Sequence, residues 1–252
     1  MLNKAISNKI KKKYNSTAKQ WDKVWTKSEE INNKIIKFIN QNTSDTKFLS
    51  AGIGKGDLES NLVYTEIYGV DISRSMIDIC KERNPRFKLY VGNVEHLRYK
   101  DNSFDIVFAR NLLRNFVNPS KAFKEMYRVL KKNGKLIIIE TAVYKGEEKY
   151  MTYIIRIADP FRPVSPTHEG LKKLFVNNKL HNISQKVVRY NDKWLTKWCI
   201  SKDVGEDKKQ EVINYVLHKI SKEYIKKYKI KVYLKEREIK QDLTFSFIKG
   251  TK

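Results

Sequence analysis

The sequence is poor in cysteine, histidine and long apolar runs. Its 252 residues include two cysteines, Cys80 and Cys199, and four histidines. Two cysteines so far apart supply neither a disulfide framework nor a CxxC metal motif, and the histidines form no HExxH pair. No segment approaches the ~18 uninterrupted apolar residues of a membrane-spanning helix, and the N-terminus lacks the apolar region of a signal peptide. We therefore expect a cytoplasmic protein with no integral membrane segment and no bound structural metal.

Acidic residues are outnumbered almost two to one. The chain has 52 Lys plus Arg against 28 Asp plus Glu, a formal net charge of +24. Such an excess is typical of proteins that bind nucleic acid. Most of the lysines, however, alternate with acids or apolar residues, as on a solvated face, and only 9–13 and 222–240 are denser. The charge therefore leaves two interpretations open, an RNA-binding surface and an ordinary solvated one.

Proline and glycine, at five and ten residues, are too few to form a linker that divides the chain. The length fits one domain, or a domain with an added lobe. Hydrophobic residues make up 40% and aromatic residues 12%, which is enough for a folded core rather than a disordered chain.

Short apolar segments and helical segments alternate along the middle of the chain. Strands are expected at 46–51, 66–72, 87–93, 104–110 and 135–141, and helices at 57–63, 73–84 and 118–133. This alternation indicates right-handed βαβ units and a parallel sheet covered by helices. The strand KLIIIET has consecutive apolar residues, as expected of a strand buried on both faces. Ligands of such sheets bind beyond the carboxyl ends of the strands.

The pattern loosens after Glu140. Helices are expected at 146–158 and 170–180, a strand at 181–190, a mostly helical lysine-rich segment at 206–240, and a final strand in DLTFSFIKG. A last strand after so long an excursion would pair most simply antiparallel at the edge of the sheet. The predicted fold class is therefore α/β: a doubly wound, mostly parallel sheet of about seven strands with an antiparallel last strand and a helical lid insertion.

A glycine-rich turn and one acid point to a nucleotide-like ligand. Gly52, Gly54 and Gly56 form a GxGxG turn after the first strand, where glycine lets the backbone approach a ligand and the following helix favours an anionic group. Asp71 ends the second strand about 20 residues later, where an acid can accept hydrogen bonds from both ribose hydroxyls. An ordinary tight turn and a helix-capping Asp are the alternatives.

Several segments together resemble a known family. AGIGKG, GVDIS, GNVEHL, NSFDIVFARNLL and FKEMYRVLKKNGKLIIIE are similar, in this order, to the motifs of class I S-adenosylmethionine-dependent methyltransferases. The resemblance is strongest to the small-molecule enzymes that include the menaquinone and ubiquinone C-methyltransferases, and it covers residues 14–140. It implies a Rossmann-like fold with S-adenosylmethionine as the cofactor. The chain would divide into a helical cofactor-covering segment at 1–45, a cofactor-binding core at 46–140, a substrate and lid insertion at 141–240, and a final edge strand at 241–252.

The resemblance also implies which residues hold the cofactor. By role they are Gly52 and Gly54 at the methionine half, Asp71 at the ribose, Ile72 and Met76 on the adenine, Asn93 and Val94 at the adenine edge, Arg110 near the sulfonium, and Tyr14 in a segment that closes over the cofactor. Ala51, just before the glycine turn, is a further cofactor-binding candidate. Packing between helices is the alternative role for Tyr14.

Three positions depart from the family pattern. Ser50 stands where the family usually has an acid that helps to hold the cofactor's ammonium group, and Asn93 stands where an Asp is usual. Lys55 occupies a turn position that is commonly small. Its charge could attract the methionine carboxylate, but we expect it to face solvent, as lysines generally do.

No general base is evident in the sequence. His168, in the proline-rich segment before a helix, is a weak candidate for a base or a substrate-orienting group, with helix capping as the alternative. Arg156 and Arg162 flank the same segment and could bind an anionic or phenolic substrate or form local ion pairs. The leading hypothesis is methyl transfer to a small aromatic or lipophilic acceptor. The alternatives are an RNA methyltransferase that uses the basic surface, and a non-catalytic binding protein on a methyltransferase scaffold.

Overall fold

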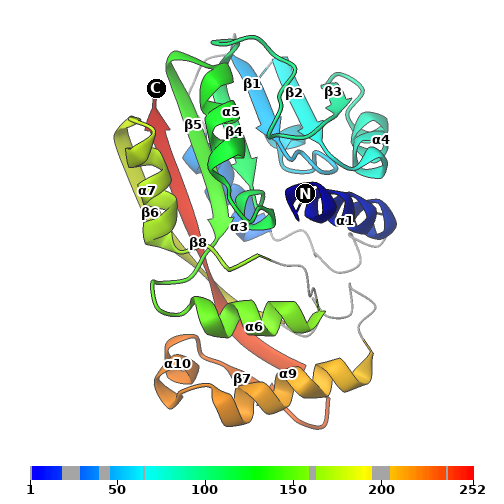
Figure 1. The fold of residues 1–252 in the computed structure, drawn as a ribbon, viewed down its shortest axis with the longest axis vertical. Coiled ribbons are helices and arrows are strands. Elements are labelled where there is room, and N and C mark those ends of the chain that lie inside the picture. The colour runs from blue at the N-terminus through cyan, green and yellow to red at the C-terminus, as the bar shows by residue number, and fades with distance from the viewer. Residues whose placement is uncertain are drawn as a thin grey trace.

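The sheet at the centre of the molecule carries helices on both faces (Figure 1). The computed structural model describes residues 2–18, 29–39, 46–64, 66–158, 163–194, 205–236 and 238–252. Five of its strands run parallel: β1 (Lys47–Ala51), β2 (Glu66–Asp71), β3 (Lys88–Val91), β4 (Phe104–Arg110) and β5 (Leu130–Thr141). They lie in the order β3-β2-β1-β4-β5, followed by β8 and β6. The predicted mostly parallel α/β sheet is confirmed.

The final strand lies inside the sheet and not at its edge. β8 (Glu238–Thr251) pairs antiparallel with β5 on one side and with β6 (His181–Trp194) on the other, while the short β7 (Lys231–Tyr233) pairs with its beginning. The prediction that 241–252 forms the edge strand was therefore wrong in that respect. The burial patterns explain the order, because Phe245, Ser246, Phe247 and Ile248 are all buried, as a central strand requires.

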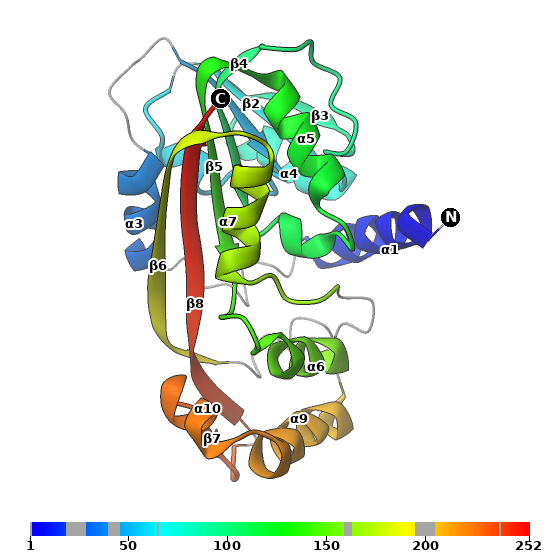
Figure 2. The same cartoon turned by 60° about the vertical axis from the view of Figure 1, so that its left-hand side comes forward.

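Two hydrophobic cores cover the two faces of the sheet. α5 (Ser120–Val129) and α7 (His168–Asn177) pack on one face, whereas α3 (Glu29–Ile39) and α4 (Arg74–Arg83) contribute to the other. Figure 2 shows α3 opposite α5 and α7. In β5, Leu136 and Ile138 enter the first core and Ile137 and Ile139 the second. This alternation is the reason for the consecutive apolar residues of KLIIIET.

Local signals set most element boundaries. Ser73 caps α4, because its side chain accepts a hydrogen bond from the Met76 N–H at 3.2 Å, and the helix ends before Asn84 and Pro85 as predicted. α5, expected to continue to residue 133, ends at Val129. The sheet extends β5 back to Leu130, and the turn is made by Asn133 at φ +64°, so strand pairing overrides the helical pattern of LKKN.

The late part of the chain forms a lobe with its own core. α6 (Glu148–Ala158), α9 (Glu206–Lys219) and α10 (Lys222–Lys227) pack around apolar side chains such as Ile154, Val212 and Tyr224. The segment 206–240, expected to be mostly helical, changes to strand at β7 and β8 because these residues extend the sheet below β5. No helix in the described part of the chain is long and apolar enough to cross a membrane.

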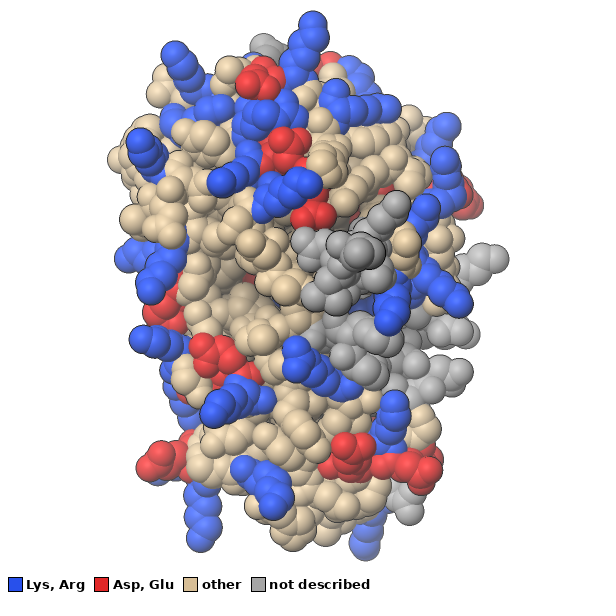
Figure 3. Space-filling view, in the orientation of Figure 1, with Lys and Arg blue, Asp and Glu red and all other residues tan. Residues whose placement is uncertain are grey.

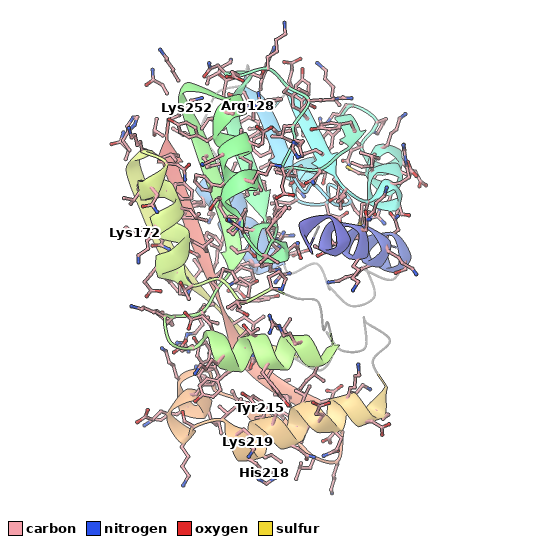
Figure 4. The ribbon with its side chains drawn as sticks, viewed as in Figure 1. Arg128, Lys172, Tyr215, His218, Lys219 and Lys252 are labelled. Atoms are coloured by element: carbon pink, nitrogen blue, oxygen red, sulfur yellow. The ribbon has the colours of Figure 1, made fainter. Side chains whose placement is uncertain are left out.

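The two dense basic stretches do not meet on one face. α1 (Leu2–Thr17), which carries Lys9–Lys13, lies apart from α10 and β7 in both Figures 1 and 2, and Figure 3 shows Lys and Arg spread among acids and uncharged residues. Figure 4 shows Lys172 on α7 and Lys219 on α9 well separated, with Arg128 and Lys252 at the far end of the sheet. Arg128 forms ion pairs with Glu125 and Asp101.

Candidate functional site

A cavity of about 290 Å³ opens where the parallel strands end. Nine of the ten predicted cofactor residues line it: Tyr14, Gly52, Gly54, Asp71, Ile72, Met76, Asn93, Val94 and Arg110. The tenth, Ala51, is fully buried in the core beneath the cavity, next to Ala109 of β4. Residues from the ends of β1, β2, β3 and β4 therefore meet in one place, as the topology of a parallel sheet requires.

The glycine turn is bent so that its backbone forms the cavity wall. Gly52 and Gly54 have φ values of +73° and +58°, a region that glycine enters without the strain of a side chain. The N–H groups of Gly52 and Ile53 donate to the Val70 carbonyl at 2.8 and 3.0 Å. A Cβ at Gly52 would lie 2.9 Å from Leu112 Cδ1, whereas one at Gly54 meets nothing within 4 Å. The turn is thus fixed to β2 and leaves open space beside Gly54.

Asp71 is held rigidly at the end of β2. Its Oδ2 accepts a hydrogen bond from the Gly54 N–H at 3.0 Å, and its Oδ1 accepts one from the Ser73 N–H at 2.9 Å. Burial raises the pKa of the Asp71 carboxyl, and these backbone hydrogen bonds oppose the rise. One carboxylate therefore links the glycine turn to the start of α4 and still presents free lone pairs to the cavity.

Apolar and amide side chains form the neighbouring wall. Met76 and Val94 are buried at 3% and 4% exposure, so they offer a flat, dry surface. Asn93 is fixed in a local turn, because its Oδ1 accepts from the Glu95 N–H at 3.0 Å. Such a wall can hold a planar aromatic ring with one polar edge.

The opposite wall carries charge. Arg110, at the end of β4, donates from Nη1 to Asn32 Oδ1 of α3 at 2.9 Å. Burial lowers the pKa of its guanidinium and the nearby Glu59 carboxylate raises it. Glu59 belongs to the short helix η1 (Glu59–Asn61) and is buried, with Ser50 Oγ donating to its Oε1 at 2.7 Å.

The burial of Lys55 differs from the prediction. It is only 4% exposed and lines the cavity, whereas the sequence suggested a solvent-facing lysine. Its Nζ lies 3.7 Å from Asp57 Oδ2, and this neighbouring carboxylate compensates the charge that the turn brings inside.

Tyr14 and the N-terminal helix close one side of the cavity. The Tyr14 hydroxyl donates to Asn115 Oδ1 at 3.4 Å, and Asn115 lies in η2 (Leu113–Asn115) after β4. Asn15 accepts from Ser73 Oγ at 2.7 Å and from the Ser75 N–H at 3.3 Å. These contacts hold α1 at the carboxyl ends of the strands (Figure 1).

Of the weaker candidates, His168 and Arg156 are described, and neither lines this cavity. His168 is 3% exposed, is not among the cavity residues, and shares Nε2 with Thr244 Oγ1 at 3.3 Å. Burial lowers its pKa, and its ring packs edge-on against Tyr144. It is the first residue of α7, but the cap is Thr167. Arg156 is exposed on α6, and Arg162 lies outside the described residues.

Sequence reasoning missed several cavity residues. Glu59 lies in a polar segment, and no hydrophobic pattern predicts that it is buried. Its position as an acid just after the glycine turn could have identified it as a candidate. Asn32, Tyr190 and Phe245 come from α3, β6 and β8, and only tertiary folding brings these elements to the motif-bearing strands.

Sequence comparison agrees with this geometry. Residues 49–138 match the family described as methyltransferase domain. The demethylmenaquinone methyltransferase of Chlorobaculum parvum is 29% identical over 143 residues, which are 55% of this chain and 58% of that protein. The ubiquinone/menaquinone biosynthesis C-methyltransferase UbiE of Wigglesworthia glossinidia brevipalpis is 35% identical over 117 residues, 42% of this chain and 47% of that protein. The matches thus cover about half the length of these relatives.

Solved structures share the fold over nearly the whole chain. The YcgJ protein of Bacillus subtilis superposes with a TM-score of 0.78 at 20% identity, over 88% of this chain and 98% of that one. Phosphoethanolamine N-methyltransferase 2 of Haemonchus contortus, solved with phosphomonomethylethanolamine and S-adenosylhomocysteine, gives 0.62 at 18% identity, over 93% of this chain and 57% of that one. The methyltransferase domain match over residues 49–138, the strand order and the ordered motifs together support a class I S-adenosylmethionine-dependent methyltransferase.

Proposed function

We propose that this protein transfers the methyl group of S-adenosylmethionine to a small aromatic or lipophilic acceptor. The observation that carries the proposal is the single cavity that joins the glycine turn, Asp71 and the adenine-type wall to a set of apolar side chains.

The described residues fit S-adenosylmethionine in shape and in donor set. The open space beside Gly54 admits a ligand to the backbone, and the fixed Asp71 carboxylate suits two vicinal ribose hydroxyls. Met76, Ile72 and Val94 would enclose the adenine, with Asn93 at its edge. When bound, the cofactor supplies an electrophilic methyl group on a positively charged sulfur.

The protein's part in the reaction is to bind, orient and exclude water. The glycine turn and Asp71 would hold the cofactor, and the apolar side chains would hold the acceptor. The acceptor atom could then approach the methyl group in line with the bond that breaks. Tyr14, with α1, would cover the cavity and limit the entry of water. No histidine is among the cavity residues of the described part of the chain, and an acceptor that ionises readily needs no dedicated imidazole base.

The side chains beyond the proposed cofactor residues support this acceptor class. Leu112, Phe116, Val117, Tyr190 and Phe245 line that part of the cavity. Aromatic and aliphatic side chains of this kind favour a flat or lipophilic molecule. The relatives named for quinone methylation act on molecules of that type, which supports the same class here.

The test supplies the purified protein with methyl-labelled S-adenosylmethionine and a cell extract divided into small-molecule, lipid, protein and RNA fractions. We expect label in the small-molecule or lipid fraction. Asp71→Ala, which removes the ribose acceptor, should abolish the transfer, whereas Asp78→Ala, an exposed acid on α4, should not. Label confined to RNA would support the RNA alternative, and no label with no cofactor binding would support a non-catalytic scaffold.

A further inference from the structure

The wall of the cavity lacks the acid that the family resemblance implies at position 50, yet a carboxylate stands beside that position. Ser50, the fourth residue of β1, is 1% exposed, and its Oγ donates to Glu59 Oε1 at 2.7 Å. Glu59 is 4% exposed and lines the cavity. The serine therefore positions an acid that comes from nine residues later in the chain.

This carboxylate is unusually short of partners for its burial. Apart from its own backbone N–H, Ser50 is the one group that hydrogen-bonds it within the described residues. Burial raises the pKa of Glu59, while Ser50 and the charge of Arg110 lower it. A buried carboxylate is costly unless a cation meets it.

Arg110 lies near Glu59 in the cavity lining without pairing with it. Both residues line the cavity, and each charge favours the ionised form of the other. No ion pair within 4.0 Å joins them in the described structure, and the Arg110 guanidinium is instead oriented by Asn32 Oδ1 at 2.9 Å. Two opposite charges are thus held apart in one wall, each with donors or acceptors to spare.

We propose that Glu59 and Arg110 form a subsite for a zwitterionic α-amino acid group, with Glu59 accepting from the ammonium and Arg110 donating to the carboxylate. This inference rests on the proposed function, in which the zwitterion is the methionine end of S-adenosylmethionine. Glu59 then replaces the acid absent at Ser50, and Ser50 and Asn32 are positioning residues. The site therefore keeps its carboxylate, which comes from Glu59 of η1 and not from position 50 of β1.

The test separates the two ends of the ligand by calorimetry with three stable thioethers. S-adenosylhomocysteine carries the whole zwitterion, its decarboxylated analogue keeps the ammonium alone, and methylthioadenosine has neither. We expect Glu59→Gln to weaken the first two by about 10- to 100-fold, the effect of one hydrogen bond to a charged group, and to leave methylthioadenosine within about twofold. Arg110→Met should weaken S-adenosylhomocysteine alone.

Matched controls keep the result specific. Glu66→Gln makes the same chemical change outside the cavity, where Glu66 pairs with Lys88, and should bind all three ligands like the parent protein. Methylthioadenosine binding also reports that each variant is folded. Should Glu59→Gln not fold, Ser50→Ala must still weaken S-adenosylhomocysteine at least threefold while sparing methylthioadenosine.

Three outcomes would overturn the inference. Unchanged S-adenosylhomocysteine affinity in Glu59→Gln would remove the ammonium assignment. An equal loss for methylthioadenosine would make Glu59 a structural residue. Unchanged affinity of Arg110→Met for S-adenosylhomocysteine would remove the carboxylate assignment. A parent protein that binds none of the three ligands would instead refute the proposed function itself, which distinguishes the two failures.

Discussion

Replacing Asp71 with asparagine tests the organisation of the whole site. The carboxylate accepts from the Gly54 N–H at 3.0 Å and from the Ser73 N–H at 2.9 Å. Asp71→Asn keeps one acceptor oxygen, loses the charge, and turns an amide NH2 toward one of the two donors. A lost hydrogen bond to a charged group costs about 1.5–3 kcal/mol. Relief from burying a charge, visible in the raised pKa of Asp71, offsets part of this.

We therefore expect Asp71→Asn to lower the free energy of unfolding by about 1–2 kcal/mol. Loss of one charged acceptor for a ribose hydroxyl should weaken S-adenosylhomocysteine and methylthioadenosine alike, by about 10- to 100-fold. Urea denaturation and calorimetry measure the two effects, with the exposed Asp78→Asn on α4 as the control. Affinity within about threefold of the parent protein would show that Asp71 only links the glycine turn to the start of α4 and does not contact the ligand.

Further substitutions probe the turn, the core and the buried acid. Gly52→Ala, at φ +73° and with its Cβ 2.9 Å from Leu112 Cδ1, should lose more stability in urea than Gly54→Ala, which bears only the ~1–2 kcal/mol cost of its left-handed backbone; equal losses would contradict the predicted close contact. Phe175→Ala empties a fully buried site of α7 and should cost about 3–5 kcal/mol by the same measurement, and a loss below about 1 kcal/mol would show that the site collapses. Burial raises the folded-state pKa of Glu59 above its ordinary value of 4.5. The protonated side chain therefore stabilises the folded protein below pH 4.5, and this part of the free energy of unfolding is lost as the pH rises through the folded-state pKa. Glu59→Gln should remove this fall, and urea midpoints that keep the parent's pH slope would contradict it.

The late lobe adds a third, separate core to the two that cover the faces of the sheet. Tyr150 packs against Tyr224 within it, and Tyr228 packs on Tyr224 at 4.5 Å between ring centroids. Burial raises the pKa of Tyr224 and of Tyr228, so these phenols stay neutral and act as packing side chains. Tyr144 and Tyr150 therefore pack against the lobe's core, and neither is among the residues that line the cavity.

Much of the cavity lining was predictable from the sequence, because local chemistry determines it. A turn with left-handed backbone needs glycine at positions 52 and 54, Ser73 caps the helix that follows Asp71, and KLIIIET must be buried on both faces. Since parallel strands all end at the same edge of the sheet, the pattern of strands along the chain was enough to place the residues that follow each strand together.

Tertiary structure decided what depends on pairing between distant segments. It put β8 between β5 and β6, ended α5 four residues before Asn133, and buried Lys55 beside Asp57. It also brought Glu59 into hydrogen-bond contact with Ser50 and into the same cavity lining as Arg110. None of these follows from periodicity or motif, because the energy of a buried charge or of a central strand is set by neighbours far along the chain.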